Sequence, residues 1–264
     1  MVFVLKNRIL VICIGIISIF AVTLSGYKIL VWLVENNTIR KITNNIENIL
    51  DLEEVSEEEL NVESFVEIDY SKISFLKANF DNLKRINNET VGFIDVSGTN
   101  ISYPVVQTDN NNFYLNHTYD KSKNSAGWVF MDYRNSFSRI QANTILYAHA
   151  RKDRTMFGDL KSVFDNKWLE ASDNHYVRVM TPDFTSVWEV FSIYRMNEVD
   201  SSYLKNEFQS ISARESFYIE LANKSIFDFG VSIDAEDKIL TLSTCDSVKE
   251  RIVLHARLMK IAYF

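Results

Sequence analysis

The chain has 264 residues, of which 47% are hydrophobic and 24% charged, values typical of a globular protein with one large or two small domains. Seven Gly and two Pro exclude collagen-like, Pro-rich and Gly/Ser-rich low-complexity chains. The net charge of −7 is unevenly distributed, because residues 1–28 carry +3 and residues 29–264 carry −10. An acidic chain without a basic stripe argues against a nucleic-acid partner.

The first predicted element is a membrane-spanning helix over residues 9–27. These nineteen residues carry no charge, and as a helix they span about 28 Å, close to the ~30 Å hydrocarbon core of a bilayer. Lys6 and Arg8 precede them, so the positive-inside rule places residues 1–8 in the cytoplasm and the rest of the chain outside. Because the apolar run is longer than a signal-peptide core, we interpret 9–34 as an uncleaved signal anchor rather than a cleaved signal peptide or a buried core helix.

Residues 35–90 are predicted to form helices that link the anchor to the exported domain. Apolar residues recur at intervals of three and four between Val34 and Leu50, and a second helical pattern covers 70–87. Residues 47–69 carry ten acids and no Lys or Arg, which is typical of a solvated helix face or a linker rather than of a metal site.

From residue 91 onward the pattern changes to short β runs. About eight of them occur at irregular spacing, with one helix predicted at 212–225. The pattern predicts a mainly β fold with helical additions, in which a β-barrel over 91–264 follows N-terminal helices. The predicted strands cover residues 91–96, 101–107, 127–133, 143–150, 175–181, 186–196, 238–245 and 251–264.

The two cysteines are Cys13, inside the apolar run, and Cys245, in the exported part. The membrane boundary separates them, so they cannot form an intramolecular disulfide. An unpaired thiol in an oxidising compartment is either buried and inert or reactive and used.

Cys245 ends the predicted strand TLSTC, and Arg251 opens the next strand after a loop of five residues. In an antiparallel hairpin these two ends lie side by side, so the thiol and the guanidinium are expected to be neighbours. A guanidinium beside a thiol can stabilise a thiolate or cradle an oxyanion. The alternative is an ordinary surface Arg at the start of a strand.

A nucleophilic thiol needs a proton-transfer partner, most often His. His149 is the favoured candidate, because it ends the apolar strand TILYAH and precedes a polar loop, as Cys245 does. His117 lies in an aromatic and polar loop and is the alternative. His175 is expected in a turn, and His255 lies inside the last predicted strand, where a packing role is expected.

These segments together resemble the sortases, the membrane-anchored cysteine transpeptidases of Gram-positive bacteria. TLSTC followed closely by RIV resembles the sortase signature, and LYAHARKDRTMFGDLKSVFD at 146–165 resembles the segment around the sortase catalytic His. NNNFYLNHTYDKSKNSAGWVFMDYRN at 110–135 resembles the class B branch, as does the helical region before the barrel. The resemblance covers residues 70–264, although the loop after Cys245 is shorter than in many class B members.

The resemblance implies a closed eight-stranded sortase-type β-barrel with Cys245 as nucleophile, His149 as acid and base, and Arg251 as the third catalytic residue. Ser243 and Thr244 are candidate substrate-binding or supporting residues. Ser243 shares a strand face with Cys245 by period-two alternation, and the alternative is a hydroxyl that only packs within the barrel.

The same resemblance implies cleavage of a sorting motif, of Asn-Pro-x-Thr type, in surface proteins, which are then joined to an amine of peptidoglycan or of a lipid-linked wall precursor. It implies no metal, no organic cofactor, and a catalytic domain held outside the cell membrane by the N-terminal helix. Asp246 is expected to be a solvated loop residue rather than an orienting acid. The alternatives are a pilin-polymerising sortase, a membrane-anchored cysteine peptidase that only hydrolyses, and a non-enzymatic wall or adhesion module with an inert Cys245.

Overall fold

The computed structural model describes residues 2–56, 60–65, 73–197, 200–244 and 250–264. The chain divides into two compact units, Met1–Asn44 and Asn45–Phe264. Helix α1 (Val2–Ile49) makes up the first unit and continues into the second. Its apolar side chains between Ile12 and Val34 are exposed, and among the described residues it is the one helix long and apolar enough to cross a membrane. This length and composition suit a membrane anchor or a signal sequence.

Residues 50–90 are not helical throughout, which corrects the sequence prediction. After α1 ends, β1 (Leu52–Val55) and β3 (Phe75–Ala78) form a two-stranded antiparallel sheet. β2 (Asn61–Ser64) pairs instead with the last strand of the chain. Helix α2 (Phe80–Ile86) forms within the predicted second helix, and it begins after Asn79, whose side chain accepts a hydrogen bond from the Asp81 amide.

The physical reason for this difference is burial against distant strands. Phe75 of β3 is fully buried in a cluster with Val187 and Met259, which lie more than a hundred residues further along the chain. Such tertiary contacts override weak local propensity in short segments. The acidic side chains in β1 and β2 are exposed, as a solvated face requires, whereas residues 57–59 and 66–69 of the acidic run lie outside the described residues.

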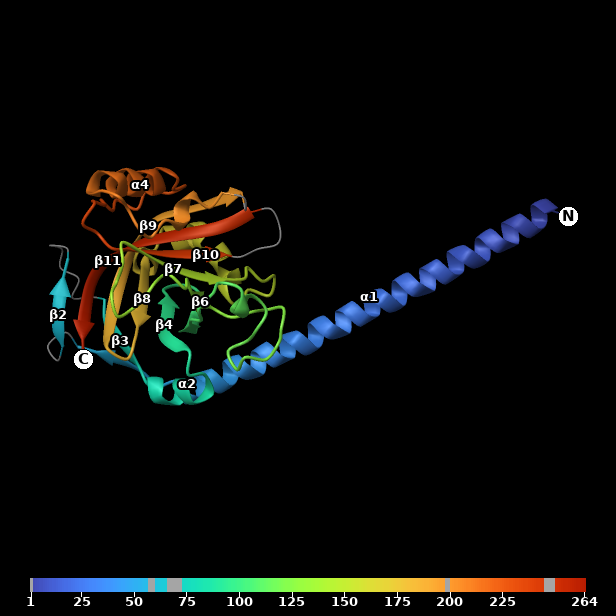
Figure 1. Cartoon of the computed structure of the whole chain (residues 1–264), viewed down its shortest axis with the longest axis horizontal. Helices are drawn as coiled ribbons and strands as arrows, with labels where there is room; N and C mark the ends of the chain where they lie inside the picture. The colour runs from blue at the N-terminus through green and yellow to red at the C-terminus, as the bar shows by residue number, and fades with distance from the viewer. Residues whose placement is uncertain (1, 57–59, 66–72, 198–199, 245–249) are drawn as a thin grey trace. The chain divides into compact units, whose positions relative to one another are not determined.

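Eight strands close into a barrel, which confirms the predicted fold class. They are β4 (Thr90–Val96), β5 (Ser102–Val106), β6 (Phe130–Met131), β7 (Asn143–Ala148), β8 (Tyr176–Met180), β9 (Phe184–Asn197), β10 (Ile239–Thr244) and β11 (Glu250–Tyr263). Their order is β10-β7-β6-β5-β4-β8-β9-β11, and a β10–β11 pairing completes the circle (Figure 1). Neighbours are antiparallel except in the β5–β6 and β7–β10 pairs, which are parallel.

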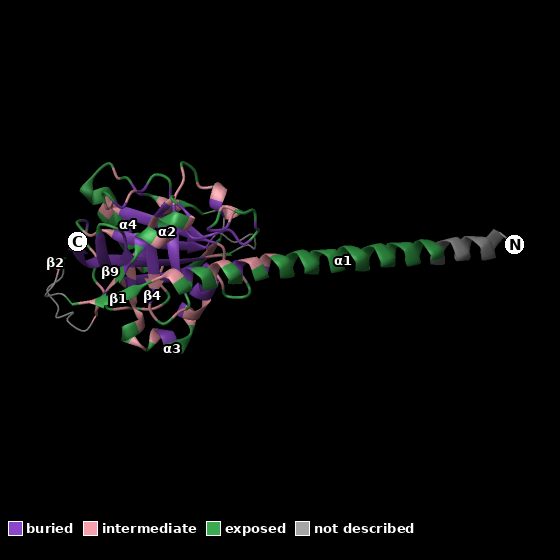
Figure 2. Cartoon of the chain, turned by 90° about the horizontal axis from the view of Figure 1, so that it is seen from below, coloured by how far each residue is buried: buried purple, intermediate pink, exposed green. Residues whose placement is uncertain are grey.

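Buried residues are concentrated in the barrel strands (Figure 2). Helix α4 (Ile211–Asn223) covers part of the barrel, and it begins after Ser210, whose hydroxyl accepts a hydrogen bond from the Ala213 amide. Phe217 and Leu221 of α4 are buried in one cluster with residues of β9, β10 and β11. Each such side chain contributes about 1.5–3 kcal/mol by leaving water, which holds the helix on the sheet.

Short helices interrupt the connections between the strands and shape the surroundings of the strand ends. They are η2 (Phe113–Leu115), η3 (Phe157–Phe164), α3 (Asn166–Leu169), η4 (Ser172–Asn174) and η5 (Ser202–Leu204). Two of them contact candidate site residues: Leu115 of η2 contacts His149, which follows β7, and Tyr203 of η5 contacts Ser243 of β10.

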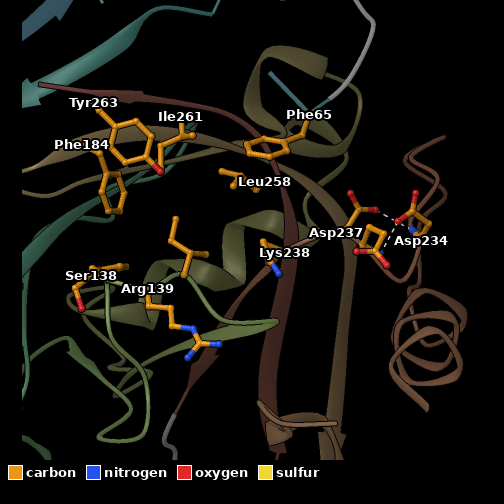
Figure 3. Close-up of a pocket in the computed structure, with 13 residues that line it drawn as sticks. Phe65, Ser138, Arg139, Phe184, Asp234, Asp237, Lys238, Leu258, Ile261 and Tyr263 are labelled. Atoms are coloured by element: carbon orange, nitrogen blue, oxygen red, sulfur yellow. Dashed lines mark hydrogen bonds between the residues drawn. The ribbon is translucent and has the colours of Figure 1, made fainter. Parts of the chain in front are cut away.

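A pocket of about 400 Å³ opens at the end of the barrel where β10 begins (Figure 3). Its apolar lining includes Phe184, Leu258 and Ile261, each of which is nearly fully buried. Charged side chains of both signs also line it, among them Lys238 and Asp237. This pocket lies at the opposite end of β10 from Thr244.

Candidate active site

The candidate site lies where three neighbouring strands meet at one edge of the barrel. β7 and β10 run parallel, and their last pair joins Ala148 to Thr244. His149 therefore leaves β7 at the edge where β10 ends. β11 begins at Glu250 and pairs with β10 in an antiparallel register that matches Val253 with Ser243, so Arg251 lies at the same edge.

Cys245 and Asp246 lie outside the described residues, as does the remainder of the loop 245–249. The described residues on both sides of this loop are tied together. The Thr244 hydroxyl accepts a hydrogen bond of 2.8 Å from the Ile252 amide, which joins the end of β10 to the start of β11. Thr244 is fully buried, and this contact gives its side chain a supporting position within the barrel wall.

His149 is oriented by the backbone of η2. Its Nε2 lies 2.7 Å from the carbonyl oxygen of Leu115. A carbonyl oxygen only accepts hydrogen bonds, so Nε2 carries a proton and donates it in this contact. The neutral ring in this contact is therefore the Nε2–H tautomer.

Gly127 allows the loop after η2 to approach the His149 ring. Its φ of +61° lies in the left-handed region, which Gly adopts without a Cβ penalty. A Cβ at this position would lie 2.5 Å from the Tyr114 carbonyl oxygen and 3.1 Å from His149 Cδ2. A side chain here would therefore push the loop away from the imidazole.

Arg251 is oriented by Tyr203 of η5. The Arg251 Nη1 donates a hydrogen bond of 3.1 Å to Tyr203 Oη, and the same oxygen lies 2.7 Å from Ser243 Oγ. Since guanidinium only donates, the phenolic oxygen accepts from Arg251 and its own proton is available to the Ser243 hydroxyl. Tyr203 and Ser243 are both fully buried, so this chain of contacts holds the guanidinium at the barrel rim.

The rings of the other three histidines form hydrogen bonds with residues outside the candidate catalytic set. His255 is fully buried, with Nε2 at 2.8 Å from Tyr194 Oη and Nδ1 at 2.9 Å from Thr241 Oγ1. Burial lowers the pKa of His255 to about 3, so its ring stays neutral within the barrel wall. This is the packing role that its position in a strand predicts.

His117 and His175 are tied to local backbone. His117 Nδ1 lies 2.8 Å from the Phe113 carbonyl oxygen, and its ring stacks on Phe113. His175 Nε2 lies 3.0 Å from the Leu169 carbonyl oxygen, and burial lowers the pKa of this group. In the part of the chain that the structure describes, no three His, Cys, Asp or Glu side chains gather as metal ligands.

The structure adds three residues that sequence reasoning missed: Leu115, Gly127 and Tyr203. Leu115 acts through its carbonyl oxygen, which leaves no signature in the residue type. Tyr203 lies 40 residues before Ser243 in the chain, and no motif links the two. Gly127 offered the one available signal, because a lone Gly in a polar loop often marks a left-handed backbone.

Comparison with known proteins places this architecture in a family. A model of the sortase domain matches residues 94–259. Sortase B of Listeria monocytogenes is 32% identical over 182 residues, which cover 67% of this chain and 73% of that protein. Sortase B of Staphylococcus aureus is 32% identical over 196 residues, which cover 71% of this chain and 77% of that protein.

Solved structures agree. A structure of Bacillus anthracis sortase B has a TM-score of 0.69 and 32% identity, and the match covers 86% of this chain and 99% of that one. The structure of Clostridium perfringens sortase B has a TM-score of 0.64 and 35% identity, and the match covers 69% of this chain and 100% of that one. The structure of a Staphylococcus aureus sortase B–substrate complex has a TM-score of 0.64 and 32% identity, and the match covers 69% of this chain and 84% of that one.

The closed barrel and the arrangement of its strand ends thus define a sortase-type fold. The chain belongs to the sortase family of cysteine transpeptidases, on its class B branch.

Proposed function

We propose that this chain cleaves a sorting motif of the Asn-Pro-x-Thr type in surface proteins and joins them to an amine of peptidoglycan or of a lipid-linked wall precursor. The observation that carries the proposal is the register of β7 and β10, which pairs Ala148 with Thr244. This register supports an arrangement in which His149 and Cys245, the next residues along the two strands, lie side by side. The similar Staphylococcus aureus protein has been solved with a substrate, which supports a peptide substrate here.

Cys245 is the nucleophile in this proposal. Its thiolate attacks the carbonyl carbon of the Thr in the motif, and the peptide bond that follows the Thr breaks. His149, as imidazolium, gives its proton to the leaving amine, and a thioester remains on Cys245. An acceptor amine then attacks the thioester and gives a proton back to His149, while the thiolate leaves and an amide forms.

The described contacts support one route for this proton transfer. Because Nε2 of His149 donates to the Leu115 carbonyl oxygen, Nδ1 is the nitrogen that gives and takes the proton. The Arg251 guanidinium favours the thiolate form of Cys245 and donates to the developing oxyanion or to the peptide backbone. Ser243 and Tyr203 support Arg251 through the shared hydroxyl contacts.

The N-terminal helix fits the same function. We place residues 1–8 in the cytoplasm, 9–34 in the membrane and the catalytic barrel of 91–264 outside, with 35–90 between them. Such an anchor confines the enzyme to the surface where membrane-held substrates and wall precursors occur, which raises its encounter rate with both.

The test uses the full chain in detergent micelles, incubated with Asn-Pro-x-Thr peptides and a peptide amine. Mass spectrometry of the wild-type chain should show a thioester adduct on Cys245 and an amide product. Cys245→Ala should abolish both, whereas the matched variant Cys13→Ala, which removes the thiol in the apolar helix, should retain both. Cleavage by Cys245→Ala at the wild-type rate would overturn the proposal.

The product identifies the reaction. An amide to the peptide amine is the expected transpeptidation product. A free carboxylic acid in the presence of the amine would indicate a peptidase that only hydrolyses. Preference for the side-chain amine of a Lys in a pilin-type protein would indicate a polymerising enzyme.

A further inference from the structure

Asp132 follows β6 directly, and its side chain is fully buried. It is not one of the candidate catalytic residues. Its backbone amide donates to the Ile145 carbonyl oxygen of β7 at 2.9 Å, which extends the barrel pairing by one residue. A carboxylate without solvent contact is costly unless hydrogen bonds replace its hydration. The environment of Asp132 therefore has to supply donors from the surrounding segments.

Arg134 supplies most of them. Its backbone amide and Nε donate to Asp132 Oδ1 at 2.9 and 2.8 Å, and its Nη2 donates to Oδ2 at 2.8 Å. Bidentate pairing of this kind fixes both partners in one geometry. Burial alone would raise the pKa of Asp132, but the hydrogen bonds from Arg134 and Tyr147 lower it below its ordinary value, so the carboxylate is ionised at neutral pH.

One arm of this pair reaches the loop that orients His149. Asn111 Nδ2 donates to Asp132 Oδ2 at 3.1 Å, and Asn111 Oδ1 accepts from the Tyr133 amide at 3.0 Å. Four residues later in the same loop, the Leu115 carbonyl oxygen accepts from His149 Nε2. The Asp132 carboxylate thus fixes the start of the segment that selects the tautomer of His149.

A second arm reaches β7 itself. Tyr147 Oη donates to Asp132 Oδ2 at 2.9 Å. Tyr147 belongs to β7 and lies two residues before His149, which follows the end of this strand. The carboxylate therefore holds both the strand that carries His149 and the loop that accepts from its ring.

The third arm reaches the segment that orients Arg251. Arg134 Nη2 donates to the Leu204 carbonyl oxygen at 3.2 Å, in addition to its contact with Asp132. Leu204 follows Tyr203, whose Oη accepts from Arg251 Nη1 at 3.1 Å. The Asp132–Arg134 ion pair therefore contacts the segments that orient both His149 and Arg251.

We propose that the Asp132–Arg134 pair is a positioning pair that sets the relative geometry of His149 and Arg251, by joining the loop of Leu115, strand β7 and the segment of Tyr203. In this role the pair acts through the residues that support His149 and Arg251. The inference deepens the proposed transpeptidase function and rests on it for its effect on turnover. Its effect on the His149 ring, however, can be measured without any substrate.

The decisive experiment compares Asp132→Asn and Arg134→Lys with a matched control, Glu189→Gln, in the full chain. Glu189 pairs with Arg257 at 2.9 Å, and both side chains are mostly buried. Arg257 lies opposite Ile239, the first residue of β10, so this pair is at the other end of the strand. Glu189→Gln removes a carboxylate of similar burial without touching the supports of His149 or Arg251.

The primary measurement is the tautomer of the His149 ring, read by ¹⁵N NMR of chain labelled at histidine and assigned with a His149→Gln sample. At about pH 8 the wild-type chain and Glu189→Gln should show the Nε2–H form. Asp132→Asn, which places an amide NH₂ against the donors of Asn111 and Tyr147, should show a mixture with the Nδ1–H form. Arg134→Lys should shift the ring signals less, because Asp132 keeps its charge and loses only the bidentate fork.

Turnover is the second measurement. If the chain transfers sorting peptides, Asp132→Asn and Arg134→Lys should lower kcat by about 10- to 100-fold with a smaller change in KM, since misplacement of catalytic groups acts on the chemical step. Glu189→Gln should lower the melting temperature without this loss. A wild-type His149 spectrum in both Asp132→Asn and Arg134→Lys would overturn the positioning role, as would an equal change in Glu189→Gln.

The two proposals fail separately. One outcome is that no peptide is turned over, while the His149 tautomer changes in Asp132→Asn and not in the control Glu189→Gln. The positioning role then stands and the transpeptidase assignment falls. If Asp132→Asn does not fold, Arg134→Lys decides, because Arg134 is partly exposed and keeps a positive charge beside the carboxylate.

Discussion

The two ends of β10 differ in their surroundings. At the Thr244 end, Thr244 and Ser243 bond to residues of β11 and η5. At the other end, Lys238 lines a pocket with both apolar and charged side chains. The Thr244 end holds His149 and Arg251 by hydrogen bonds to Leu115 and Tyr203. The pocket at the Lys238 end has a volume of about 400 Å³, and the described hydrogen bonds in its lining join Asp234, Glu236 and Asp237 to one another and to Tyr218. The difference shows that convergent, oriented donors and acceptors distinguish the candidate site better than hollow volume does.

Among the substitutions that compare the two ends of β10, the largest effect is expected for Arg251→Lys. An ammonium group keeps the charge but cannot both donate to Tyr203 and present a planar fork to an oxyanion. We expect kcat/KM for peptide cleavage to fall by about 100- to 1000-fold, the loss typical of an oxyanion donor. Arg257→Lys, near the first residue of β10, is the matched control and should stay close to wild type. Normal turnover by Arg251→Lys would reduce Arg251 to a packing role.

Within this comparison of the two ends, Tyr203→Phe should have the next largest effect. The change removes the hydroxyl that joins Arg251 to Ser243, and kcat/KM should fall by about 10-fold because the guanidinium loses its support. Tyr218→Phe is the control at the other end of β10, where the Tyr218 hydroxyl donates to the Ala142 and Asp237 carbonyl oxygens. Both variants should lose about 1–3 kcal/mol of unfolding free energy. Equal activity loss in both would remove the distinction between the two ends.

His255 provides a pH-dependent test of the barrel wall between the two ends. Burial lowers its pKa to about 3, while the unfolded chain titrates near ~6.5. The unfolded state therefore binds a proton that the native state excludes, so stability is lost as the pH falls from about 6.5 toward 3. From pH 7 to pH 5.5 this one group should cost about 1 kcal/mol of unfolding free energy.

Urea unfolding at these two pH values measures that cost. His255→Gln cannot take up the proton, so its loss of stability between the two values should be smaller than that of wild type by about 1 kcal/mol. An identical pH dependence in both chains would show that His255 is not kept neutral by the fold.

The smallest effect is expected at the pocket. Lys238→Gln and Arg139→Gln change the charge of its rim, and each should shift the unfolding free energy by no more than about 0.5 kcal/mol. Peptide cleavage should be unchanged. A loss of kcat/KM as large as that of Tyr203→Phe would show that the Lys238 end also acts in the reaction, and the contrast between the ends would have to be abandoned.

Short apolar runs predicted most of the barrel strands, because a buried strand is a run of neighbouring apolar and β-branched residues that can be read locally. The predicted strands at 91–96, 143–150 and 238–245 fall within one or two residues of β4, β7 and β10. The pattern failed in the described strands between residues 52 and 78. These short strands form through pairing, and the partner of β2, strand β11, lies nearly two hundred residues further along the chain. Local propensity carries no information about such partners.

The sequence by itself determined the membrane-type helix, the run of barrel strands, and the candidates Cys245, His149 and Arg251 at strand ends, because apolar runs, alternation and motifs are properties of neighbouring residues. Tertiary structure alone decided that β7 and β10 pair in parallel and that Leu115 accepts from His149. It also decided that Tyr203 joins Arg251 to Ser243. These contacts link residues 34 to 48 positions apart through single atoms, and only the folded backbone brings such atoms within hydrogen-bond distance.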